Sequence, residues 1–309
     1  MHTKCSNLEP GLFQSKAPVT VREFGDRYTL IGPLNPKTVA HEVEALEPAS
    51  SYLKAALNTL SSYGVKYHYG RWLIEGAPHV LLFDLASVWE RLSRWKRYFW
   101  NMLNASASDE DVEANNAVSF GYVVAWFFDE VGVPPGLSQG GAGFAAMCRL
   151  PNQDFCKIQS AFLHLPPLWL AAAGLILAAK RRLELATIFT AHATVLGRHL
   201  SASGVDLYGN LQNFDCEKEA TDGGIYRRYR IEYLATQCAD CFTTVSNITG
   251  YEAENLLKRS PDCILPSGLN IANVMTHVRG GGGGDPGPCY RSKKGQRCLT
   301  LDFGRVFYS

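Results

Sequence analysis

The stretch ATIFTAHATVLGRHL, residues 186–200, carries the strongest structural signal in the chain. Residues 185–190 form a short apolar run that predicts a buried strand. The residues delivered just past the end of this strand include His192, Thr194, Gly197 and Arg198. Small residues there let the backbone approach a ligand, and an arginine presents a planar fork of donors that matches phosphate oxygens. The spacing favours a phosphate or sugar-phosphate site at a strand end, with a structural role for His192 and Arg198 as the alternative.

Outward from this stretch, short β-rich runs alternate with helical runs. The predicted strands are residues 27–33, 65–69, 79–85, 241–245 and 262–265. The predicted helices are residues 51–63, 87–103, 111–130, 217–239 and 247–258, the fourth weakened by Gly223 and Gly224. Strands separated by helices predict an α/β fold with a largely parallel sheet covered by helices on both faces. Ligands then bind outside the carboxyl ends of the strands.

Composition narrows the class of protein. The 309 residues allow about two domains, and 46% of them are hydrophobic, which excludes disorder throughout. Thirty basic and 29 acidic residues give a net charge of +1. A chain this close to neutral lacks the dense basic face of nucleic-acid-binding proteins, so no nucleic-acid partner is expected.

Several features of the sequence argue against other classes of protein. Nine cysteines at irregular spacing argue against a disulfide framework. Cys238 and Cys241 form a lone CxxC pair, which we interpret as a helix end running into a buried strand, and no metal or cofactor is expected. The start of the chain has no apolar leader, so a cytoplasmic protein is expected and the sequons at Asn104 and Asn247 are attributed to chance. The apolar run 168–179 is shorter than the roughly 20 residues of a membrane-spanning helix and predicts a buried helix instead, with no membrane partner.

A series of motifs follows the order found in one enzyme family. They are GDRYTLIGP (25–33), YGRWLIEGAP (69–78), ERLSRWK (90–96), EANNAVSFGY (113–122), ATIFTAHATVLGRHL (186–200), YGNLQNFDCEKEA (208–220), IYRRYRIE (225–232), FTTVSNITGYEAENLLKRSPD (242–262) and LPSGLN (265–270). In these motifs the chain resembles the animal and fungal glycogen synthases, which have the two-domain GT-B fold. The resemblance implies a Rossmann-like parallel sheet with helices on both faces, forming the N-terminal half of that fold.

The resemblance also implies an activity. Members of this family transfer glucose from UDP-glucose to the non-reducing end of an α-1,4-glucan, with retention at the anomeric carbon. His192 and Arg198 fall on the donor-binding positions of the family. Asn210 and Asn213 lie on a loop that orients sugar hydroxyls or simply forms a turn. The implied partners are UDP-glucose, glycogen, glycogenin and further copies of the chain in a homo-oligomer.

The chain departs from the family pattern in three places. The resemblance spans residues 12–275 as an incomplete N-terminal domain, without the family's glycine-rich loop at its start. Residues 131–167 interrupt it as an atypical insert, with Leu165 to Leu168 in place of the family's HFHEW turn, and we expect irregular structure there. Residues 279–309 open with a run of glycines and continue into a basic stretch, which predicts a disordered tail.

These departures give two interpretations of the chain. One is a fragment of a glycogen synthase, from a misassembled gene model or a natural splice form, that is inactive on its own because the family's second domain is not matched. The other is a catalytically silent interaction module that binds glycogenin, glycogen or synthase subunits.

Overall fold

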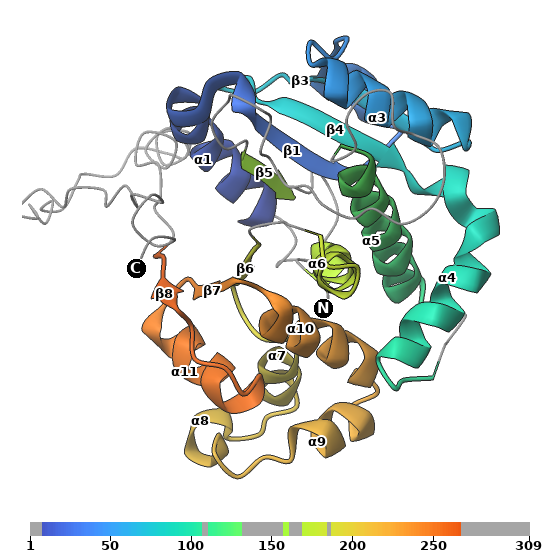
Figure 1. The fold of residues 1–309 in the computed structure, drawn as a ribbon. Coiled ribbons are helices and arrows are strands. Elements are labelled where there is room, and N and C mark those ends of the chain that lie inside the picture. The colour runs from blue at the N-terminus through green and yellow to red at the C-terminus, as the bar shows by residue number, and fades with distance from the viewer. Residues whose placement is uncertain (1–7, 107–110, 132–156, 161–168, 184–186, 267–309) are drawn as a thin grey trace, which may run out of the picture. The chain divides into compact units, whose positions relative to one another are not determined.

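The structure is a computed structural model that describes residues 8–106, 111–131, 157–160, 169–183 and 187–266 (Figure 1). The α-helices are α1 (Leu8–Phe24), α2 (Val39–Glu42), α3 (Ser51–Ser62), α4 (Trp89–Met102), α5 (Val112–Val131), α6 (Trp169–Lys180), α7 (Val195–Ala202), α8 (Leu207–Asn210), α9 (Cys216–Asp222), α10 (Tyr226–Cys238) and α11 (Asn247–Leu256). The strands are β1 (Tyr28–Pro33), β2 (Val43–Ala45), β3 (Lys66–Trp72), β4 (His79–Asp84), β5 (Lys157–Ser160), β6 (Ile188–Ala191), β7 (Cys241–Thr244) and β8 (Cys263–Ile264). Short 3-10 helices span Gly25–Arg27 and Leu85–Val88. The predicted tail, residues 279–309, lies outside the described residues.

The first sheet is mixed and has the strand order β2-β3-β4-β1-β5. β1 pairs in parallel with both β4 and β5, whereas β3 is antiparallel to β2 and β4. The connection from β3 to β4 spans residues 73–78, which is too short for a parallel crossover, so these two strands must form an antiparallel pair.

Helices cover both faces of this sheet. Alternate residues of β1 and β4 point to opposite faces, as the period of a strand requires. One face carries Ile31, Leu81 and Phe83, which belong to the main hydrophobic core together with residues of α3, α4 and α5. The other face carries Leu30, Val80 and Leu82, which pack in a second core against Val21 and Phe24 of α1. The predicted α/β class with helices on both faces is therefore confirmed.

The second sheet is parallel, with the order β6-β7-β8. Phe189 of β6 lies in register with Phe242 of β7, and their rings stack with centroids 6.2 Å apart. Both side chains belong to the main hydrophobic core. Cys238 ends α10 and Cys241 begins β7, so the prediction of a helix end running into a strand is confirmed.

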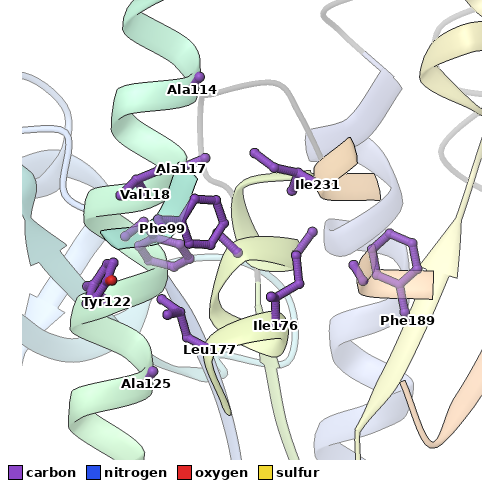
Figure 2. Packing of buried hydrophobic residues seen from close by; sticks show 14 of the residues in the cluster. Phe99, Ala114, Ala117, Val118, Tyr122, Ala125, Ile176, Leu177, Phe189 and Ile231 are labelled. Carbon is purple, nitrogen blue, oxygen red and sulfur yellow. The ribbon is translucent and has the colours of Figure 1, made fainter. Parts of the chain in front are cut away.

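Helix α6 occupies the centre of the main core. Figure 2 shows Ile176 and Leu177 of α6 lying between the side chains of α5 on one side and those of Ile231 and Phe189 on the other. The backbones of α5 and α6 approach closely at Gly121, where an added Cβ would lie only 2.7 Å from the Cβ of Ala173. The predicted buried helix 168–179 is thus confirmed as α6. In the described part of the chain, no helix has the length and apolar character needed to cross a membrane.

Three expectations about the secondary structure were wrong. The strands form two sheets rather than one. Their pairing is largely parallel as expected, since four of the six strand pairs in the described residues are parallel, and the exceptions are the pairs that β3 makes with β2 and β4. The helix predicted for residues 217–239 is broken into α9 and α10, because Gly224 takes a positive φ of 68° that ends the first helix. Irregular structure was expected throughout residues 131–167, yet Lys157–Ser160 form β5. The open edge of β1 supplies the backbone partners for β5, and residues 132–156 and 161–168 lie outside the described part.

Candidate functional site

The segment from β6 to α7 is built as its sequence predicts. β6 ends at Ala191, so His192 follows directly at the carboxyl end of a parallel strand. Thr194 then takes an extended conformation and caps α7, because its hydroxyl oxygen accepts a hydrogen bond from the Gly197 backbone N–H at 3.0 Å. Arg198 lies in the first turn and a half of the helix, where its backbone N–H donates to the Thr194 carbonyl.

Two buried glutamates occupy backbone donors at the start of α7. The Thr194 backbone N–H donates to Oε1 of Glu252 on α11 at 3.3 Å, and the Val195 N–H donates to Oε2 of Glu232 on α10 at 2.8 Å. The two glutamates are 7% and 5% exposed. Free N–H groups at a helix N-terminus commonly bind phosphate. Because these two N–H groups are already satisfied within the protein, they are not free donors for a ligand, and the exposed side chain of Arg198 is the nearby cationic group on α7.

His192 and Arg198 lie within electrostatic reach of each other. Burial lowers the pKa of His192 below its ordinary value of 6.5, and the positive charges of Lys16 and Arg198 lower it further. The imidazole is therefore neutral at neutral pH and offers one donor and one acceptor to a ligand. The Arg198 residue is exposed, so its guanidinium can reach a ligand in solution. The predicted pair is thus brought together at one strand end.

Glu232 lies close enough to Arg198 for the charge of the arginine to affect its pKa. Burial raises its pKa from 4.5 to about 8, the Val195 N–H and Arg198 lower it, and Glu252 raises it. Near pH 7 the group is mostly protonated, and its carbonyl oxygen still serves as the acceptor for the Val195 N–H. A largely neutral Glu232 places little negative charge beside Arg198 and the start of α7.

Asn210 and Asn213 lie at the end of a short helix and in the turn that follows it. Asn210 ends α8, where its side-chain amide donates to the Asp206 carbonyl at 3.1 Å. The Asn213 backbone N–H donates to the Asn210 carbonyl at 2.8 Å, and both residues are exposed. In the part of the chain that is described, neither side chain is hydrogen-bonded to His192 or Arg198. These contacts form a turn, and a sugar contact by either side chain stays a prediction.

Sequence reasoning missed Glu232 and Glu252 as parts of the site. They are 37 and 58 residues away in sequence from the backbone groups that they bind. Each lies in a predicted helix, and the residues around it in sequence do not distinguish it from an acidic residue exposed to solvent. Within the described residues, no group of three or more His, Cys, Asp or Glu side chains is arranged to hold a metal ion.

Comparisons with known proteins identify the family of this chain. The glycogen synthase family model matches residues 10–278. A Neurospora crassa protein named glycogen [starch] synthase is 47% identical over 260 residues, which cover 84% of this chain and 34% of the relative. Glycogen [starch] synthase isoform 1 of Saccharomyces cerevisiae is 44% identical over 285 residues, covering 88% of this chain and 37% of the relative.

The similarity extends to mammals. The liver glycogen [starch] synthase of Rattus norvegicus is 41% identical over 260 residues, covering 84% of this chain and 34% of the relative. The chain spans about a third of the length of the curated relatives it matches. Since the family model covers most of these 309 residues, the chain belongs to the glycogen synthase family.

Proposed function

We propose that this chain contributes the donor-binding side of a glycogen synthase, which transfers glucose from UDP-glucose to the non-reducing end of an α-1,4-glucan with retention. In this proposal Arg198 binds diphosphate oxygens, and His192 lies beside the transferred glucose. The observation that supports it most directly is the joint position of these two residues at the carboxyl end of β6, where ligands of parallel α/β sheets bind.

The proposed chemistry follows from the charges of the two groups. A guanidinium forms charge-assisted hydrogen bonds with phosphate oxygens and stabilises the negative charge that develops on the departing UDP. The neutral imidazole of His192 donates one hydrogen bond and accepts another, which suits a sugar hydroxyl better than a second cation would.

UDP binding to the purified chain tests the proposal. Isothermal titration calorimetry should detect binding of UDP and UDP-glucose, and Arg198→Ala should weaken it. A charge-assisted hydrogen bond contributes about 1.5 to 3 kcal/mol, which corresponds to a roughly 10-fold to 100-fold loss of affinity. Arg97→Ala, which removes an exposed arginine from α4, is the matched control and should leave the affinity unchanged. Equal affinities of Arg198→Ala and the wild type would refute the assignment of Arg198.

Glucose transfer is a separate measurement. Since the chain spans about a third of its relatives, we expect the purified polypeptide to bind the donor without elongating glycogen. Radiolabelled transfer from UDP-glucose to glycogen, with Arg198→Ala as the control, measures this. Transfer above background that disappears in Arg198→Ala would show that these 309 residues are competent by themselves.

A catalytically silent interaction module is the second candidate function. It predicts that the chain binds glycogen, glycogenin or other synthase subunits and has no measurable affinity for UDP. Cosedimentation with glycogen and sedimentation velocity of the chain, with and without glycogenin, separate this candidate from donor binding and test for a homo-oligomer. A cytoplasmic location is part of both candidate functions, as the family membership implies.

A further inference from the structure

Glu252 is a buried carboxylate whose donors come mainly from one residue of the candidate site. Its Oε1 accepts from the backbone N–H of Thr194 at 3.3 Å and also from the Thr194 hydroxyl. The Tyr208 phenol lies close to the same carboxylate, since burial and then the charge of Glu252 raise the pKa of Tyr208. A buried carboxylate is strongly unfavourable unless donors replace its lost water. The two donors of Thr194 therefore explain why the Glu252 side chain can be buried, and they hold its carboxylate at the start of α7.

A continuous line of hydrogen bonds runs from Glu252 into α7. The Thr194 hydroxyl donates to Glu252 and accepts from the Gly197 backbone N–H at 3.0 Å. Gly197 is also the residue that leaves room for the carboxylate, since an added Cβ would lie 2.0 Å from Oε1 of Glu252. The side chain of Glu252 on α11 thus fits the space left by Gly197 and binds the hydroxyl of Thr194. In this way a residue of another helix fixes the backbone immediately before Arg198.

Glu232 supports the neighbouring position. Its carboxyl group accepts the Val195 N–H at 2.8 Å from the side of α10. Thr194 and Val195 are consecutive, and they lie between His192 and Arg198. The segment that carries the two proposed donor-binding side chains is therefore held from two helices that are distant in sequence.

We propose that Glu252 is a positioning residue for the donor, acting through Thr194 to set the place of Arg198 and His192 without touching the ligand. This inference rests on the proposed function, in which Arg198 binds the diphosphate. The physical reason is that a binding or reacting group displaced by about 1 Å can lose about 100-fold in effectiveness. A capping bond that fixes the first turn of α7 limits such displacement of Arg198.

The test compares UDP affinities of the full chain by titration calorimetry. Glu252→Ala should weaken UDP binding about tenfold or more, because the Thr194 hydroxyl and N–H lose their acceptor. Glu252→Gln should restore the affinity to within about threefold of the wild type, because its amide oxygen can accept both hydrogen bonds. In an Arg198→Ala background, Glu252→Ala should have no further effect, since the two residues act on one contact.

A matched control separates positioning from general destabilisation. Asp111 also caps a helix, because it accepts the Ala114 N–H of α5 at 3.0 Å, and it pairs with Arg228 at 3.2 Å. Asp111→Ala should lower the stability of the chain while leaving UDP affinity unchanged. Should Glu252→Ala fail to fold, Thr194→Val removes the same hydroxyl bonds at nearly constant volume and carries the same expectation.

Hydrogen exchange provides a readout that does not need UDP. In Glu252→Ala, the amides of residues 192–198 should exchange at least about tenfold faster, while those of β1 and β4 stay unchanged. If the wild type does not bind UDP, the proposed function fails, and the exchange data still decide whether Glu252 fixes this segment. Unchanged exchange in residues 192–198 would overturn the positioning role. So would equal UDP affinities of Glu252→Ala and wild type, no rescue by Glu252→Gln, or additive effects of Glu252→Ala and Arg198→Ala.

Discussion

The buried carboxyl group of Glu232 predicts that the stability of the chain falls as the pH rises from 6.5 to 8. In the folded chain burial raises the pKa of Glu232 to about 8, whereas the same group ionises near its ordinary value of 4.5 when unfolded. Between these values the folded state binds a proton that the unfolded state lacks. The stability that this proton contributes to the folded state is therefore lost as the pH rises from 6.5 to 8.

The size of the effect follows from proton linkage. A group that is protonated in the folded state and ionised in the unfolded state changes the free energy of unfolding by about 1.4 kcal/mol per pH unit. Between pH 6.5 and 8 Glu232 should lower it by about 1.5 kcal/mol, because the folded group itself begins to ionise near pH 8. His192 has a lowered pKa and the opposite sign of linkage, and above pH 6.5 its contribution fades as the unfolded imidazole loses its proton, so it only partly offsets the effect of Glu232 at the lower end of the range.

Urea denaturation at several pH values between 6.5 and 8 measures this slope. Glu232→Gln should be nearly independent of pH in this window, because glutamine keeps an acceptor for the Val195 N–H and does not ionise. Glu217→Gln, which changes a glutamate whose side chain is 62% exposed, should keep the wild-type slope. A wild type without a slope, or an unchanged slope in Glu232→Gln, would refute the reasoning.

Three further predictions concern packing and helix ends, and urea denaturation measures each of them. Gly121→Ala should destabilise the chain by about 1 to 3 kcal/mol, because the new methyl group would overlap Ala173 where α5 crosses α6; full wild-type stability would contradict the crossing. Arg259→Ala should cost about 1 to 3 kcal/mol, because its guanidinium donates to two carbonyls at the end of α10 and pairs with Asp262 at 2.7 Å. Arg259→Lys should not restore the loss, since one ammonium cannot span these acceptors. Gly224→Ala should cost about 1 kcal/mol through its positive φ, and Gly224→Asn should cost less.

Local sequence patterns were sufficient to predict most of the helices and strands. The helix expected at residues 51–63 is α3, Ser51–Ser62, and the strand expected at 79–85 is β4, His79–Asp84. In both cases the period of apolar residues reports directly which side of the element is buried. The family was also identifiable from the sequence, because many motifs in a fixed order are far more specific than one motif. The position of His192 past the end of β6 followed from the strand pattern of the residues before it.

Pairing between distant segments was decided by the tertiary structure. β5 has four residues in a stretch without any period, and it is a strand because β1 offers it a backbone edge. The division into two sheets likewise depends on which strands find each other across the chain, which a run of apolar residues does not specify. The antiparallel pair β3 and β4 was foreseeable in principle, because the six-residue connection excludes a crossover.

In the candidate site, too, some features follow from the sequence and others from the tertiary structure. The sequence placed His192 and Arg198 near one strand end because they are close in the chain, and spacing along the backbone limits how far apart they can lie. Glu232 and Glu252 meet Thr194 and Val195 only after α10 and α11 pack beside α7. Their burial, their acceptor roles and the raised pKa of Glu232 are consequences of that packing, because desolvation depends on all surrounding elements rather than on neighbours in sequence.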